Sequence, residues 1–215
     1  WSSDVCSSDL PISGEHPYLY LDGIVMKRSW AGEVRNVSLL VASAVNTEGF
    51  REILGICEGA KEDKSGWSAF LRHLVERGLK GVRLIISDAC RGLVESIAEY
   101  LPDARWQRCM VHFYRNVFSH VPATRVREVS HMLKAIHAAE DVHAAREKAR
   151  QVTSKLRDLR LTKAAELVEN GIEETIAYYQ TASYLYRHDA YKAVSPEDQA
   201  KYRREAGLAP LAAAP

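Results

Sequence analysis

Residues 18–26 read Tyr18-Leu-Tyr-Leu-Asp22-Gly-Ile-Val-Met26, an apolar run interrupted by a single carboxylate. Aromatic and β-branched residues in such a run favour a β-strand. A carboxylate inside an apolar strand is costly unless it is paired or bound to a cation, so Asp22 is a candidate ligand rather than an ordinary surface acid. Gly23 follows it and would let another backbone or a ligand approach closely.

Outward from this run, the first half of the chain alternates strands and helices. The expected strands are Val37 to Val45, Arg51 to Cys57 and Val82 to Ser87, and Arg105 to Val111 is either a strand or the start of a helix. One expected helix begins at Ser65 and has Gly78 as its stop signal. A second runs from Leu93 to Leu101, before Pro102. Three early strands followed by alternating helix and strand predict a mixed α/β fold.

Asp88 is the second candidate ligand. It ends the apolar strand Leu84-Ile-Ile-Ser87 and precedes a helix. Functional sites in α/β folds collect at the carboxyl ends of strands. Two aspartates on neighbouring strands could hold a divalent metal with oxygen ligands. The competing interpretation is structural, because an aspartate at a strand end often serves only as a helix N-cap.

The second half of the chain has a helical period. From Pro122 to about Tyr179 the apolar residues step by three and four, and Asp141 is placed to cap one of the helices. We expect this region to be helical without adding a strand to the sheet. Basic residues crowd two of its helices, namely Arg146, Lys148, Arg150, Lys155, Arg157, Arg160 and Lys163. They indicate either a solvated helix face or a phosphate-binding face to which Arg146, Arg150 and Arg157 contribute.

Cys109 and His112 form a Cys-x-x-His pair. A closed zinc site needs four ligands, and neither Cys57 nor Cys90 has a spacing that completes one, so a structural role is favoured. Nearby polar side chains are suited to phosphate contact, and they are Arg108, Arg115 and Asn116.

The bulk properties exclude several classes of protein. The 215 residues carry a formal net charge of +1, so the overall charge does not indicate a nucleic-acid partner. The sequence contains neither a run of about 20 apolar residues nor a signal peptide, and its four scattered cysteines favour reduced thiols. There is also no Gly-rich phosphate loop and no Gly-x-Ser-x-Gly motif, which disfavours kinases, P-loop proteins and α/β-hydrolases.

In combination, these motifs resemble the Mutator-type DDE transposase family of bacterial insertion sequences. The resemblance covers roughly residues 18 to 178. The matching segments are Tyr18-Leu-Tyr-Leu-Asp22-Gly, Gly66-Trp67 with Leu74 and Arg77-Gly78, Ile85-Ile-Ser-Asp88-Ala with Gly92-Leu93, Gln107-Arg-Cys109-Met-Val-His112 with Arg115-Asn116, and Ala164 to Thr175.

The resemblance implies an RNase H-like mixed sheet with an all-helical insertion. It makes Asp22 and Asp88 the first two catalytic acids and ligands of Mg²⁺ or Mn²⁺, with Cys109 and His112 as support near the site. The implied reaction is cleavage and strand transfer of double-stranded DNA at element ends and target. The complete protein would act as a homodimer in the bacterial cytoplasm, associated with the nucleoid and without a membrane.

The expected organisation has four parts. Residues 1–14 form a disordered or foreign leader, 15–121 the catalytic core, 122–179 the helical insertion, and 180–215 a divergent tail that is expected to be disordered. The family's third acid, a Glu in an Asn-x-x-Glu-Arg motif, is not identifiable. The nearest candidates are Glu173, Glu174, Glu197 and Glu205.

We therefore expect a fragment of a transposase that is inactive alone, from a truncated or frameshifted reading frame. Two alternatives stay open, namely a non-catalytic DNA-binding or multimerisation remnant and an RNase H-like nuclease unrelated to transposition. A phosphatase-like or receiver-like domain that uses Asp22 is a third, although no Lys, Ser or Thr stands out as a phosphate partner.

Overall fold

The computed structural model describes residues 10–30, 32–59, 63–179 and 181. Five strands form one sheet in the order β3-β2-β1-β4-β5. Their bounds are Tyr18–Trp30 for β1, Glu33–Val45 for β2, Arg51–Gly59 for β3, Leu84–Ser87 for β4 and Arg105–Arg108 for β5. The first three strands pair antiparallel, whereas β4 runs parallel to β1, and β5 runs parallel to β4. This is the RNase H-like mixed sheet expected from the sequence, so the predicted fold class is confirmed.

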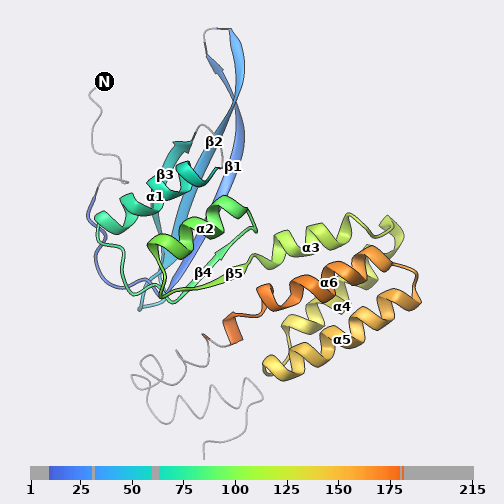
Figure 1. Cartoon of the computed structure of the whole chain (residues 1–215). Helices are drawn as coiled ribbons and strands as arrows, with labels where there is room; N and C mark the ends of the chain where they lie inside the picture. Colours follow the sequence, from blue (N-terminus) through green and yellow to red (C-terminus); the bar gives the residue numbers. More distant parts are fainter. Residues whose placement is uncertain (1–9, 31, 60–62, 180, 182–215) are drawn as a thin grey trace, which may run out of the picture.

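Alternation along β1 determines which of its side chains enter the core. Leu19 and Leu21 are buried against helices, while their neighbours Tyr20 and Asp22 face the other side of the sheet. Helices α1, Lys64–Glu76, and α2, Arg91–Tyr100, both lie on the face to which Leu19 and Leu21 point (Figure 1). The β1–β2 hairpin continues beyond the part that pairs with β3 and projects from the sheet (Figure 1).

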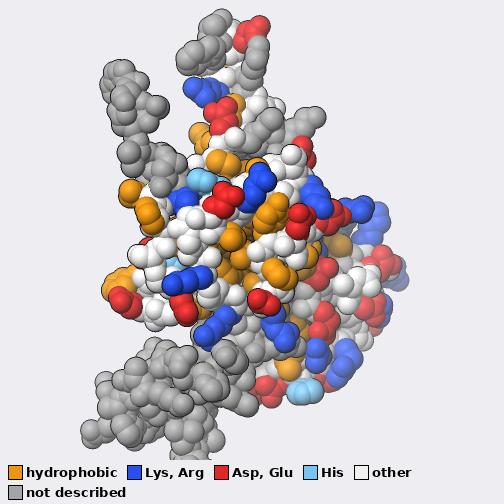
Figure 2. Space-filling model, turned by 60° about the vertical axis from the view of Figure 1, so that its left-hand side comes forward, with side chains coloured by type: hydrophobic (Ala, Val, Ile, Leu, Met, Phe, Trp, Pro, Cys, Tyr) orange, Lys and Arg blue, Asp and Glu red, His pale blue; other side chains and the backbone are white. Residues whose placement is uncertain are grey.

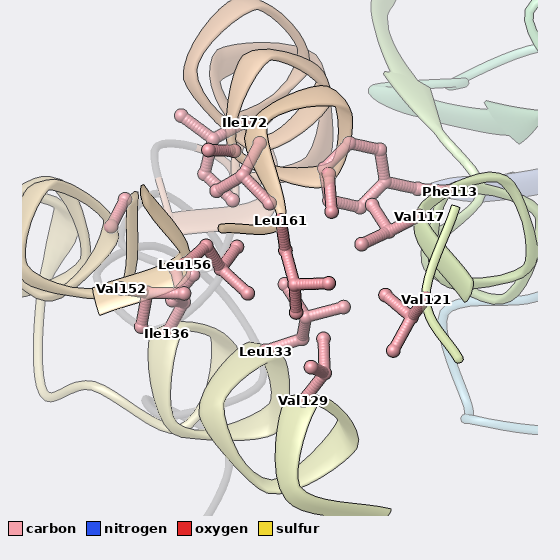
Figure 3. Packing of buried hydrophobic residues seen from close by; sticks show 14 of the residues in the cluster. Phe113, Val117, Val121, Val129, Leu133, Ile136, Val152, Leu156, Leu161 and Ile172 are labelled. Carbon is pink, nitrogen blue, oxygen red and sulfur yellow. The ribbon is translucent and has the colours of Figure 1, made fainter. Parts of the chain in front are cut away.

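The second half of the chain is a helical bundle beside the β5 edge of the sheet (Figure 1). Its helices are α3, Met110–Phe118, the 3₁₀ turn η2, Ala123–Arg125, then α4, Val126–His137, α5, Val142–Asp158, and α6, Thr162–Thr175. Their apolar faces meet in one core, in which Leu133, Ile136 and Leu156 are fully buried (Figure 3). The expected helices are confirmed, and no strand lies among the described residues between 122 and 179.

The ambiguous segment from Arg105 to Val111 is a strand followed by a helix. Strand β5 ends at Arg108, and Cys109 is the N-cap residue from which α3 begins. Phe113 and Val117 of α3 belong to the core of the helical bundle rather than to the core under the sheet (Figure 3). The two cores therefore meet near Cys109, earlier than the boundary at residue 122 that the change of period suggests.

Some expectations concern the ends of the chain. Most of the expected leader and all of the tail except Thr181 lie outside the described residues. Leu10 and Ile12, which the sequence groups with the leader, are tied to the body: the Leu10 carbonyl accepts from Arg77 Nε at 2.8 Å, and Ile12 N donates to the Arg77 carbonyl at 2.7 Å. Within the described part of the chain, no helix is long and apolar enough to span a bilayer.

Candidate active site

Asp22 and Asp88 lie on the neighbouring central strands β1 and β4, or directly after them. The register of β1 and β4 pairs Tyr18 with Leu84 and Tyr20 with Ile86. Asp22 comes two residues after Tyr20, and Asp88 comes two residues after Ile86. Partners in a parallel register point to the same face, and neighbouring strands are about 4.8 Å apart. If the register is extended by two residues beyond its last pair, both side chains come near the carboxyl end of β4 and on one face of the sheet.

The side chain of Asp22 is exposed, which corrects the expectation of an apolar environment. The apolar neighbours in sequence are real, but alternation sends Leu21 into the core, where it is 2% exposed, and leaves Asp22 on the opposite face. Across the sheet, Asp22 pairs with Val41, which in turn pairs with Ile56. Its carboxylate is therefore available to solvent, to a cation or to a partner without a large desolvation cost.

Asp88 is half-buried and already oriented by the backbone. Its Oδ1 accepts a hydrogen bond from Cys90 N at 3.2 Å. The N-cap residue of α2 is Cys90, so Asp88 is not the helix cap that the structural interpretation proposed. The bond to Cys90 instead closes a short turn between β4 and α2.

Sequence reasoning missed two residues that hold the end of β4. Trp106 Nε1 donates to Ser87 Oγ at 2.9 Å, and Ser87 Oγ donates to the Asp88 carbonyl at 2.8 Å. Cys109 N also donates to the Ser87 carbonyl at 2.6 Å. The only signal in the sequence was the polar Ser87 at the end of an otherwise apolar strand.

Cys109 and His112 lie at the start of α3, directly after β5, and Cys109 N is bonded to the Ser87 carbonyl at the end of β4. Cys109 is a free thiol and the N-cap residue, and its side chain makes no cap bond. His112 Nδ1 is buried and has no hydrogen-bond partner among the described residues. Among those residues, no group of three or more His, Cys, Asp or Glu side chains is placed to hold a metal ion. A supporting role for the pair stays a prediction.

Arg108 is largely an internal side chain. It is 16% exposed, its NH1 lies 3.4 Å from Glu174 Oε2, and its guanidinium lies over the Phe113 ring at 5.6 Å from the centroid. Gly171 allows this packing, because a Cβ there would lie 2.9 Å from Phe113 Cε2. Arg115 and Asn116, the other residues expected to contact phosphate near this motif, are exposed on α3.

The basic residues of α5 are paired with acids. Arg146 binds Glu173 through two hydrogen bonds of 2.7 and 2.8 Å, and Arg157 binds Glu169 at 2.6 Å. Arg150 pairs with Glu147 on its own helix. The hydrogen bond from Arg146 holds the pKa of Glu173 below its ordinary value. The three arginines line a groove of about 420 Å³ between α5 and α6.

These pairs change how the basic stretch is interpreted. Few acidic residues lie among the basic residues in the sequence of α5, but α6 supplies Glu169 and Glu173, which pair with arginines of α5 from across the groove. On the face drawn in Figure 2, basic and acidic side chains are likewise interspersed rather than separated by sign. A phosphate that approaches Arg146 or Arg157 must therefore compete with a carboxylate that already neutralises the guanidinium.

The family model and the curated relatives that match this chain all describe transposases. The family model described as "Transposase, Mutator family" matches residues 9–204. The chain is 37% identical over 175 residues to the transposase for insertion sequence element IS1081 of Mycobacterium tuberculosis, covering 81% of this chain and 42% of that protein. It is 34% identical over 164 residues to the transposase for IS256 in transposon Tn4001 of Staphylococcus aureus, covering 76% of this chain and 42% of that protein.

Among solved structures, a chain of the Drosophila P element transposase strand transfer complex matches with a TM-score of 0.33 and 12% identity, over 78% of this chain and 50% of that chain. This chain spans 42% of the length of each of the two insertion-sequence transposases named above.

Proposed function

The chain belongs to the Mutator family of transposases, and from that premise we propose that it contributes Asp22 and Asp88 to a site that cleaves and joins DNA at the ends of an insertion sequence. The observation that carries the proposal is the β1–β4 register, which leads to both aspartates at one edge and one face of the sheet. Asp22 is exposed and Asp88 is half-buried, so both can meet a ligand that arrives from solvent.

The two side chains fit a hard divalent cation. Mg²⁺ is usually held by one or two carboxylates together with water and substrate phosphates, and Mn²⁺ accepts the same oxygen ligands. Asp22 and Asp88 would hold it. When bound, such an ion supplies charge stabilisation at a phosphoryl group and lowers the pKa of bound water. The protein's own contribution is to aim the two carboxylates and to fix the Asp88 turn through Cys90 N.

A binding titration tests this assignment. Mn²⁺ binding to the 215-residue chain should be lost or strongly weakened in Asp22→Asn and in Asp88→Asn, because each removes one anionic ligand. Asp103→Asn, an exposed aspartate in the turn before β5, is the matched control and should bind as the parent does. Equal affinity in all four proteins would contradict the assignment of the two acids.

Double-stranded DNA is the proposed partner, both as element ends and as target, and in the complete protein two copies would act together. Arg115 and Asn116 are exposed and can approach phosphates, whereas Arg146, Arg150 and Arg157 are already paired with glutamates that would compete with a phosphate. Each phosphate contact that is lost should reduce the slope of log affinity against log salt by about 0.9. Neutralising these three arginines together should flatten the slope, and an unchanged slope would assign them to a solvated face.

The third acid of the site has not been identified in this chain, so we propose that the chain alone does not cleave or join DNA. Two carboxylates leave a divalent site short of negative charge and of a positioning ligand. A strand-cleavage assay with Mg²⁺ or Mn²⁺ on a duplex that carries element ends is the test. Cleavage that disappears in Asp22→Ala would contradict the proposal and direct the search to Glu173, Glu174, Glu197 and Glu205.

A further inference from the structure

A chain of two hydrogen bonds runs from β5 to the backbone of Asp88. Trp106 Nε1 donates to Ser87 Oγ, and Ser87 Oγ donates to the Asp88 carbonyl, at 2.9 and 2.8 Å. An indole nitrogen can only donate, and a hydroxyl has one hydrogen. Because Ser87 must accept from Trp106, its single hydrogen goes to Asp88, and the direction of the whole chain is fixed. We call these two bonds the Trp106–Ser87 chain.

The environment makes the Trp106–Ser87 chain sensitive to change. Ser87 is 1% exposed, and Trp106 packs against the apolar core between the sheet and its helices. In such surroundings hydrogen bonds are stronger than in water, and a polar group that loses its partner is costly. Removing the Ser87 hydroxyl would leave the indole N–H unsatisfied and would release the Asp88 carbonyl.

Asp88 is then held at two points by different elements. Its carbonyl is held from β5 through Ser87, and its Oδ1 is held by Cys90 N at the start of α2. The peptide orientation sets the direction in which the side chain leaves the backbone. Releasing the carbonyl should therefore let the carboxylate turn away from the face that it shares with Asp22.

We propose that Ser87 and Trp106 are positioning residues, which orient the Asp88 carboxylate for the divalent cation without touching it. The inference rests on the proposed function of Asp88. Groups that hydrogen-bond to a metal-ligating residue typically change metal affinity by 10- to 100-fold when they are removed. Ser87 and Trp106 act one bond further away, through the backbone, so we expect the lower end of that range.

The chain supplies a matched control for the tryptophan. Trp67 is 1% exposed in the same core, and its Nε1 is buried without a hydrogen-bond partner among the described residues. Trp67→Phe and Trp106→Phe both shrink an indole that packs in or against this core, but only the second removes a hydrogen bond that leads to Asp88. A general effect of loosened packing would appear in both variants.

The experiment is an Mn²⁺ titration followed by electron paramagnetic resonance on the whole chain. We expect Asp88→Asn to lose binding, and Ser87→Ala and Trp106→Phe each to raise the Kd by roughly 10-fold. The double variant should be no weaker than the weaker single variant, because both substitutions break the same chain of bonds. Trp67→Phe should bind as the parent does.

A second readout needs no metal. The indole N–H resonance of Trp106 should shift in Ser87→Ala, while that of Trp67 stays in place. Unchanged Mn²⁺ affinity in both single variants, additive losses in the double variant, or an equal loss in Trp67→Phe would each overturn the positioning role. Retained binding in Asp88→Asn would overturn the proposed metal site itself, and with it this role, which separates the two failures.

Discussion

The two apolar cores of the molecule differ in how completely they are covered. In the helical bundle, α3 to α6 surround a core in which Leu133, Ile136 and Leu156 have no exposed surface (Figure 3). In the part of the chain that the structure describes, helices cover only one face of the sheet, and these are α1 and α2 (Figure 1). On its other face, among the described residues, four apolar side chains are 43–65% exposed, namely Ile24, Met26, Ile53 and Ile56.

The difference indicates a division of roles. Asp22 belongs to the open face, in the same cross-strand row as Val41 and Ile56. A carboxylate in the closed helical core would carry a large desolvation cost, whereas one on the open face is accessible to solvent. Under the proposed function, the bundle would act as a scaffold attached through β5 and α3, and the sheet would present the two acids. Substitutions in the sheet core and in the bundle core should therefore have effects that test this contrast.

The largest effect is expected from a cavity in either core. Leu133→Ala in the bundle and Leu40→Ala under the sheet each remove a side chain with no exposed surface, and each should cost about 2–5 kcal/mol of unfolding free energy. Urea unfolding measures both. The control is Val111→Ala at a site that is 56% exposed, which should stay within about 0.5 kcal/mol. A loss below about 1 kcal/mol for Leu133→Ala would mean that the bundle is less tightly closed than described.

The packing of α6 against α3 inside the bundle is tested by Gly171→Ala. The new Cβ would lie 2.9 Å from Phe113 Cε2 and 3.5 Å from Arg108 NH1, so either α6 or α3 must move. Overpacking of this kind costs about 1–3 kcal/mol, from which the better helix propensity of alanine recovers up to about 1. Thermal unfolding should show a net loss. A variant that is more stable than the parent would contradict the close approach of α6 to α3.

Smaller losses of unfolding free energy, similar for the two cores, are expected when the helix caps Asp141 and Asp63 are replaced. Asp141 accepts from Ala144 N at the start of α5, and Asp63 accepts from Gly66 N at the start of α1. Replacing either with alanine should cost about 1 kcal/mol, whereas asparagine should keep most of the cap. Because α1 lies in the sheet core and α5 in the bundle, matching losses would show that both cores unfold together. A loss from only one cap would separate them.

The smallest effect is a pH dependence confined to the bundle. His137 Nδ1 lies 2.8 Å from Tyr114 OH and 3.1 Å from the Leu133 carbonyl oxygen, and its Nε2 lies 2.9 Å from Thr175 Oγ1. Burial lowers the pKa of His137 below its ordinary value of 6.5. The unfolded chain then binds the proton more tightly, so this contribution to stability is complete above pH 6.5 and falls as the pH drops towards the lowered pKa.

The measurement is urea unfolding between pH 7.5 and 5.5. In His137→Asn the slope of stability against pH over that window should be smaller than in the parent. His120→Gln, at an exposed histidine, should leave the slope unchanged. An unaltered slope in His137→Asn would show that the imidazole is not held neutral by its surroundings.

The sequence predicted local features well and tertiary pairing poorly. The strand through Asp22, the helix after Asp141 and the apolar seam of α5 depend on periods and caps within a few residues, and the structure confirms them. The pairing of Arg146 with Glu173, by contrast, joins residues 27 positions apart on two helices. No spacing along one helix contains that information.

The same limit applies at the candidate site. Sequence reasoning selected Asp22 and Asp88 and expected neighbouring strands, and β1 and β4 are indeed neighbours in the sheet. That the two carboxylates share one site stays a prediction. It did not foresee that Asp22 is exposed, because the direction of a side chain depends on which face the helices cover. It also missed Trp106, whose hydrogen bond to Ser87 exists only once β5 lies beside β4.

The central claim is that Asp22 and Asp88 form one site, and anomalous diffraction from Mn²⁺-soaked crystals of this chain tests it most directly. The account predicts a manganese peak in contact with carboxylate oxygens of both residues, and no such peak in crystals of Asp88→Asn. Carboxylates more than about 10 Å apart, or a peak bound to other side chains alone, would contradict it.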